Sequence, residues 1–116
     1  MKQRKKGRRC VSNNPEDLKL LTLAKATQAR SGATSAAALR DTTGRTYVAI
    51  PVAIGDFHVD AIHAVLVVAL ASQISGIEAI VVAGTKPEQS SIYAVTNFSA
   101  SAQVFWINPG EELELL

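Results

Sequence analysis

The stretch from Ala61 to about Ser75 constrains the fold most, because as a helix it is apolar around almost its whole circumference. Asp60 can cap such a helix and Gly76 can end it. The length of the stretch favours a helix, although its many valines are commoner in strands. A helix without a polar face must be buried at the centre of a protein or covered by another subunit. We therefore expect a central helix or an oligomer contact here.

Helical and strand patterns alternate along the rest of the chain. Asn14 and Gly32 bracket a first helix, with Pro15 at its first position. The next predicted elements are a β-hairpin over 36–40 and 45–53, a strand over 77–83, a helix over 88–97 and a strand over 103–108. Residues 111–116 fit either a strand or a short helix, and the first hairpin's second strand should end near Pro51 or lie at an edge. The order α-β-β-α-β-α-β predicts a three-layer α/β/α sandwich.

The charge is distributed unevenly along the chain. Its 116 residues fit a single domain, and 12 Lys and Arg oppose 10 Asp and Glu. Half of the positive charges lie in the first nine residues, at Lys2, Arg4, Lys5, Lys6, Arg8 and Arg9. We expect residues 1–13 to be a flexible basic tail and residues 14–116 to be one domain. The tail is either a solvated terminus or an arm that makes weak, salt-sensitive contacts to RNA.

The composition also limits the compartment and the metal chemistry. A single cysteine, Cys10, excludes an internal disulfide and a multi-cysteine zinc site. The basic start lacks the apolar run of a secretory signal, and no apolar stretch approaches the roughly 20 residues that cross a bilayer. We expect a cytoplasmic protein that does not enter membranes.

Several strings of residues resemble, in order, those of one enzyme family. Residues 36–47 (Ala-Ala-Ala-Leu-Arg-Asp-Thr-Thr-Gly-Arg-Thr-Tyr) are similar to the hairpin of the cytidine deaminases. The string from Ala79 to Val82 is similar to a later strand, and Val104 to Gly110 to the last strand and its Asn-Pro turn. The likeness covers residues 15–108 and implies the cytidine deaminase-like α/β/α fold. It also implies a homodimer or homotetramer.

The resemblance assigns the site positions, and the residues there depart from the family pattern. Cytidine deaminases hold zinc with one His or Cys and two Cys, and a nearby Glu moves protons. His63-Ala64-Val65 matches the His-Ala-Glu that opens the family's apolar helix, with Val65 in place of the Glu. Pro87 to Ser91 matches Pro-Cys-x-x-Cys, with Glu88 and Ser91 in place of both thiols. His63 is then the only residue of a ligand type, so we expect no zinc, no other cofactor and no catalytic residue.

Other polar residues suggest weaker alternatives. His58 and His63 are five residues apart, which does not place them on one helical face. Asp56 and Asp60 flank a short segment, either as a catalytic pair or as helix-entry residues.

These observations favour a non-catalytic cytidine deaminase-like protein over an enzyme. Its role would be binding or accessory, with a nucleoside, a nucleotide or RNA as partner. The alternative is a weak or altered deaminase of cytidine or another nucleoside that uses His63, Glu88 or Asp60.

Overall fold

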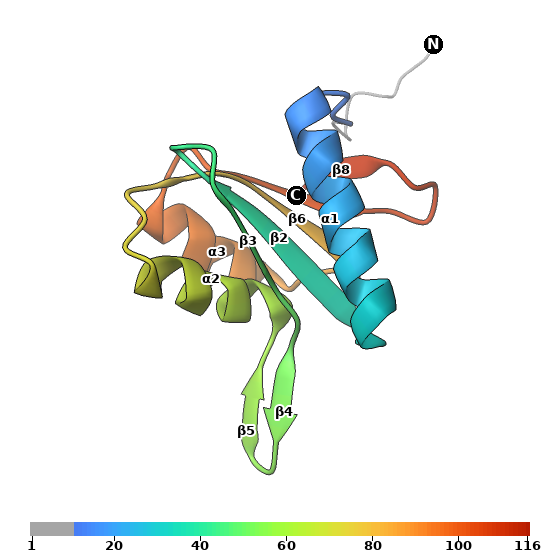
Figure 1. The fold of residues 1–116 in the computed structure, drawn as a ribbon, viewed down its shortest axis with the longest axis vertical. Helices are drawn as coiled ribbons and strands as arrows, with labels where there is room; N and C mark the ends of the chain where they lie inside the picture. Colours follow the sequence, from blue (N-terminus) through green and yellow to red (C-terminus); the bar gives the residue numbers. More distant parts are fainter. Residues whose placement is uncertain (1–10) are drawn as a thin grey trace.

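The computed structural model describes residues 11–116 and shows a mixed sheet between two helical layers (Figure 1). The five-stranded sheet has the order β3-β2-β6-β7-β8, and β4 pairs only with β5. The elements are α1 (Pro15–Ser31), β2 (Ser35–Asp41), β3 (Thr46–Ala49), β4 (Val52–Ile54), β5 (Phe57–Val59), α2 (Ala61–Ala71), β6 (Ile77–Gly84), α3 (Gln89–Phe98), β7 (Gln103–Ile107) and β8 (Leu113–Leu115). The predicted three-layer α/β/α sandwich is confirmed. Residues 111–116, which fitted either a strand or a short helix, contain the strand β8.

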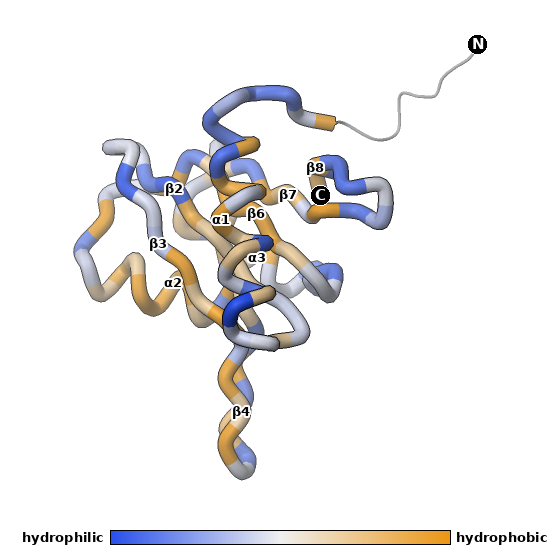
Figure 2. The backbone as a smooth tube through the Cα atoms, turned by 45° about the vertical axis from the view of Figure 1, so that its right-hand side comes forward, coloured by the Kyte–Doolittle hydropathy of each residue, from blue (hydrophilic) through white to orange (hydrophobic). Residues whose placement is uncertain are grey.

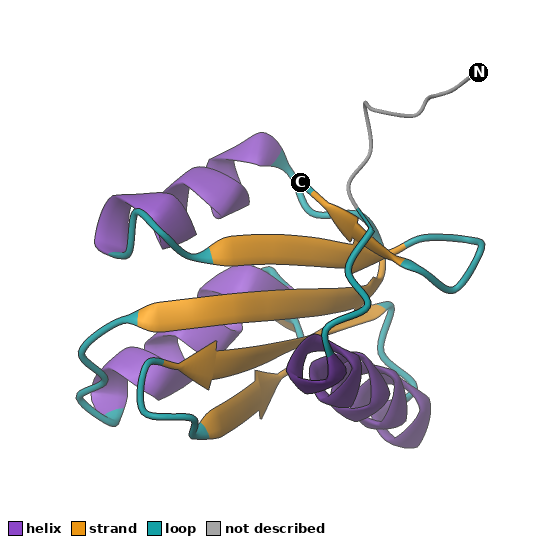
Figure 3. Cartoon of the chain, turned by 90° about the horizontal axis from the view of Figure 1, so that it is seen from above, coloured by secondary structure: helices purple, strands orange, loops and turns teal. Residues whose placement is uncertain are grey.

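Strand β6 lies at the centre of the sheet. It pairs antiparallel with β2 and parallel with β7, and α3 makes the crossover between β6 and β7. Strands β3 and β8 form the two edges, each antiparallel to its neighbour. Figure 3 shows the helices lying on opposite sides of these strands.

Alternating residues of the strands build two separate cores. Leu39, Ile80 and Val82 pack with α2 and α3, whereas Ala38 and Val81 pack with α1. Neighbouring side chains of a strand point to opposite faces, so both faces of β2 and β6 are apolar. This is why the two strands read as continuous apolar runs.

Helix α1 begins and ends at the predicted residues. Asn14 Oδ1 accepts a hydrogen bond from the Glu16 amide at 2.9 Å, and Gly32 ends the helix at φ 72°. Arg40 then joins the helix to the sheet, because its guanidinium donates to Asp17 at 3.0 Å and to Glu78 at 2.6 Å.

Helix α2 is shorter and less buried than the sequence predicts. It ends at Ala71 rather than near Ser75. Its inner face is in the core, but Val67 is 64% exposed, and Val68 and Leu70 are also exposed. A fully buried central helix is therefore wrong for the single chain, and the second alternative, an oligomer contact, stays a prediction.

A small hairpin was not predicted. Strand β3 ends at Ala49, just before Pro51, and lies at an edge of the sheet, as predicted; after Pro51 the chain forms β4 and β5, joined through Gly55. Figure 1 shows this hairpin projecting from the body, and Figure 2 shows its apolar residues. Ile54 is 73% exposed and Phe57 is 61% exposed.

The start of the described chain contacts the last strand. Val11 forms a bridge with Glu114, and the Ser12 amide donates to the Leu113 carbonyl at 3.2 Å. Residues 11 and 12 of the predicted tail are thus held against β8. The six basic residues lie outside the described residues, so RNA contact through them stays a prediction. None of the described helices is long and apolar enough to cross a membrane.

Replacing Gly84 by alanine is expected to destabilise the fold by about 2–5 kcal/mol. Gly84 has φ 90°, and an added Cβ would lie 2.2 Å from the Thr34 carbonyl oxygen. Gly44→Ala is the matched control, since Gly44 has φ 92° with nothing within 4 Å of the new Cβ. Urea denaturation should give a clearly larger loss for Gly84→Ala, and equal losses would contradict this account.

Candidate functional site

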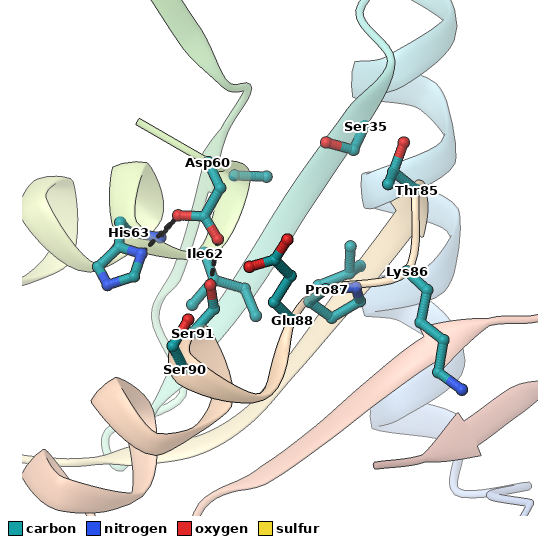
Figure 4. Close-up of a pocket in the computed structure, with 12 residues that line it drawn as sticks. Ser35, Asp60, Ile62, His63, Thr85, Lys86, Pro87, Glu88, Ser90 and Ser91 are labelled. Carbon is teal, nitrogen blue, oxygen red and sulfur yellow. Dashed lines mark hydrogen bonds and ion pairs between the residues drawn. The ribbon is translucent and has the colours of Figure 1, made fainter. Parts of the chain in front are cut away.

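Helices α2 and α3 begin on the same side of the sheet and enclose a pocket of about 390 Å³ (Figure 4). Ser35 of β2 and Val82 of β6 contribute from the sheet. Ile62 and Pro87 add apolar surface, and the polar side chains are Asp60, His63, Thr85, Lys86, Glu88, Ser90 and Ser91. The pocket forms because β2 begins where β6 ends, with Ser35 paired to Gly84.

Asp60 is the centre of the hydrogen bonding at this pocket. As the N-cap of α2 it accepts from the His63 amide at 3.1 Å. Its Oδ1 also lies 2.5 Å from His63 Nδ1, and its Oδ2 accepts from the hydroxyl of Ser91. Since Ser91 lies in the first turn of α3, one carboxylate joins the starts of both helices.

These hydrogen bonds keep Asp60 ionised. Partial burial by itself would raise the pKa of Asp60. The hydrogen bonds from Ser91 and His63 outweigh burial and hold the pKa below its ordinary value. The pocket therefore contains a fixed negative charge at neutral pH.

Glu88 supplies a second carboxylate, which, unlike that of Asp60, makes no hydrogen bond to another described residue. It is the N-cap residue of α3, yet its side chain does not accept from the helix amides. In Figure 4 it points away from α3, toward the side of the pocket where Asp60 and Ser35 lie. Among residues 11–116, no donor or cation is paired with this carboxylate.

The structure brings together most of the site residues expected from the sequence. His63, Glu88 and Ser91 all line the pocket. Val65 does not: it is completely buried in the core beside the sheet. The prediction that Val65 occupies the place of the proton-transferring Glu is corrected by the position of the helix start. Because α2 begins at Ala61, the first-turn residues that line the pocket are Ala61, Ile62 and His63, and the third position of the family motif falls on Ile62.

Asp60 is the site residue that the motif comparison did not assign. The family motif opens a helix, and here the helix opens with Asp60-Ala61-Ile62 rather than with His63. The N-cap signal of Asp60 was visible in the sequence and would have given this alignment. His58 lies on β5 and does not line the pocket, and Asp56 lies in the turn of the projecting hairpin.

The donor set of this pocket does not fit the zinc of cytidine deaminases. That site needs one imidazole or thiolate and two further thiolates, whereas the two helix starts here supply two carboxylates, a serine hydroxyl and the His63 imidazole, whose Nδ1 is bonded to Asp60. The Asp60 carboxylate is already bonded to that hydroxyl. Among residues 11–116, no three His, Cys, Asp or Glu side chains form a group that could hold a metal ion.

The chain that forms this three-layer sandwich, with its pocket at the starts of two helices, matches the model of a known protein family. A family model described as cytidine deaminase-like matches residues 13–110, and the chain belongs to this family. No curated protein matches the sequence.

Solved structures of cytidine deaminases share the fold. The enzyme from Mycobacterium leprae superimposes with a TM-score of 0.65 at 13% identity, over 83% of this chain and 90% of that one. Two structures of the enzyme from Mycobacterium tuberculosis, wild type and a point mutant, give 0.62 at 15% identity. They cover 78% of this chain and 86% and 87% of those chains. At such identities the likeness shows the fold alone.

Ser91→Ala is expected to lower the stability at pH 7 by about 1 kcal/mol, because Asp60 loses a hydroxyl donor. The folded-state pKa of Asp60 is lowered, so its contribution is present above the unfolded pKa of about 3.9. This contribution is lost as the pH falls through the folded pKa. The difference between variant and wild type should therefore narrow below about pH 4.

Ser90→Ala is the matched control, since Ser90 lines the same pocket but makes no side-chain hydrogen bond to another described residue. Urea denaturation at pH 7 and near pH 3 measures both variants. Equal stabilities of Ser91→Ala and Ser90→Ala at pH 7 would contradict the role of the Asp60 hydrogen bond.

Proposed function

We propose that this protein is a non-catalytic member of the cytidine deaminase-like family that binds a small molecule in the pocket at the starts of α2 and α3. The observation that carries the proposal is the hydrogen bond between Asp60 and Ser91. It occupies the meeting point of two helix starts at which the family places its metal ligands. The side chains there bond to each other instead of presenting thiolates to zinc.

We also propose that the pocket lacks a residue able to transfer protons as the Glu of the family does. Ile62 lines the pocket from the first turn of α2 and cannot accept a proton. Positioned acid–base groups typically contribute about 10²–10⁴-fold to a rate. Asp60 is held ionised by two donors, so it is a weak base. We therefore propose that the protein needs no zinc and has a binding or accessory role, in the cytoplasm.

The rival function is a weak or altered nucleoside deaminase. Glu88 is the observation that favours it, because this carboxylate faces the pocket and has no partner among residues 11–116. Such a group could act as a general base. Among the described lining residues, the other acid–base side chains, Asp60 and His63, are hydrogen-bonded to each other, which disfavours the rival.

Purified full-length protein is expected to contain far less than one zinc per chain and to release no ammonia from cytidine or deoxycytidine. Elemental analysis and an ammonia assay measure both quantities. A triple variant, Asp60→Cys with Glu88→Cys and Ser91→Cys, should gain zinc, because helix N-termini favour the thiolate form that binds it. The control is the double variant Asp60→Ser with Glu88→Ser. Because residue 91 is already serine, it places hydroxyls at the three positions where the triple variant places thiols.

One zinc per wild-type chain would contradict the proposal. Cytidine turnover that Glu88→Gln or His63→Ala abolishes would establish the rival instead. Circular dichroism of each variant separates loss of binding from loss of folding.

We also propose that the protein forms a homodimer or homotetramer through the outer face of α2. Val67, Val68 and Leu70 are exposed there, and α2 contains no Asp, Glu, Lys or Arg between Ala61 and Ala71. Burial of each such side chain between subunits contributes about 1.5–3 kcal/mol.

Leu70→Lys is therefore expected to shift the protein toward the monomer. The control, Ala29→Lys, places the same charge on the exposed side of α1. Light scattering coupled to size-exclusion chromatography measures the mass. A wild-type protein that is monomeric at high concentration, or an unchanged mass of Leu70→Lys, would exclude this interface.

A further inference from the structure

Besides the exposed hydroxyl of Ser90, two polar groups of the pocket at the starts of α2 and α3 have no partner among the described residues. Ser35 lines the pocket and is only 7% exposed, and its hydroxyl makes no hydrogen bond to any residue of 11–116. A hydroxyl that opens on a pocket can donate a hydrogen bond to a bound molecule or accept one from it. The second group is the carboxylate of Glu88, which lies on the same pocket. A bound molecule with hydrogen-bond donors can therefore pair with both the Ser35 hydroxyl and the Glu88 carboxylate.

The charge of the pocket determines the sign of that molecule. Asp60 and Glu88 contribute two carboxylates. Lys86 is the one basic Lys or Arg side chain of the lining, and its Nζ is 3.9 Å from Glu114 and 5.3 Å from the centre of the Trp106 ring. Figure 4 shows it extending away from Glu88.

The helix dipoles do not reverse this balance. A helix N-terminus is equivalent to about half a positive charge, so two of them offset roughly one of the two carboxylates. The start of α2 is moreover already capped by Asp60. An anion such as a nucleotide phosphate is repelled, and a cation is attracted.

The remaining lining determines the body of the ligand. Ile62, Val82 and Pro87 give the pocket an apolar wall beside the carboxylates. The volume of about 390 Å³ fits a small molecule rather than a peptide or a nucleic acid. The ligand should therefore have a charged end and an apolar part.

We propose that the pocket binds a small organic primary amine in its ammonium form. The ammonium group donates to the Glu88 carboxylate and to the Ser35 hydroxyl oxygen, and its apolar part lies against Ile62 and Pro87. This inference rests on the proposed binding function and specifies its ligand class. Asp60 adds negative charge while it remains bonded to Ser91 and His63.

The test uses benzylamine as probe with the full-length protein, followed by amide shifts in two-dimensional NMR. Benzyl alcohol and benzoate are the neutral and anionic analogues, and cytidine is a separate arm. We expect benzylamine to shift the amides of Ile62 and Ser90 at millimolar concentration, with little effect from either analogue. Glu88→Gln should weaken the binding about tenfold or more, as loss of a charge-assisted hydrogen bond does. Ser35→Ala should weaken it less, and Asp56→Asn, which removes a carboxylate from the distant hairpin, should not weaken it.

Four results would overturn the inference. The first is no benzylamine binding up to roughly 50 mM, above the Kd expected for a fragment of this size. The second is equal binding of benzyl alcohol or benzoate, and the third is unchanged binding in Glu88→Gln. Tighter binding of cytidine that does not depend on Glu88 would also overturn it. The zinc and ammonia assays are independent of these readings, so failure of the amine proposal is distinguishable from failure of the non-catalytic proposal.

Discussion

Burial of strand β6 on both faces is the constraint on which the rest of the structure depends. It is hydrogen-bonded to β2 on one side and to β7 on the other. Its alternate side chains then require an apolar layer above and another below. Helix α1 supplies one layer and α2 with α3 supply the other. The strand therefore fixes the three layers, and its carboxyl end also fixes where the pocket forms.

The pocket illustrates how one fold can carry different chemistry. The two helix starts that meet beside β6 are a feature of the backbone. What they can do depends on the side chains placed there. In this chain Asp60 and Ser91 close a hydrogen bond between the helices, while Glu88 and Ser35 remain open to the pocket. Covalent catalysis, metal binding and simple recognition would each need a different set of residues on the same scaffold.

Much of the fold was predictable because its signals are local. The caps at Asn14, Gly32 and Asp60, and the apolar runs of β6 and β7, depend on residues close together in sequence. The hairpin of β4 and β5 was not predicted, although the two-residue loop Gly55-Asp56 between short apolar segments is a hairpin signal; strands of three residues are too short for alternation alone to reveal them. The end of α2 was placed too late because the predicted stop was Gly76, whereas the chain leaves the helix at Ser72 and turns through Gln73 at φ 64°, a conformation that a glutamine does not signal.

The sequence by itself determined the order of the elements, the sandwich they form and the absence of thiols at the helix starts. Only the tertiary structure decided which residues share the pocket. Ser91 reaches Asp60 across 31 residues, and Ser35 comes to the pocket from a strand that precedes both helices. It also decided that Val65 faces the core and Ile62 the site. The reason is that periodicity and capping act within a few residues, whereas contacts between elements depend on the register and order of strands across the whole sheet.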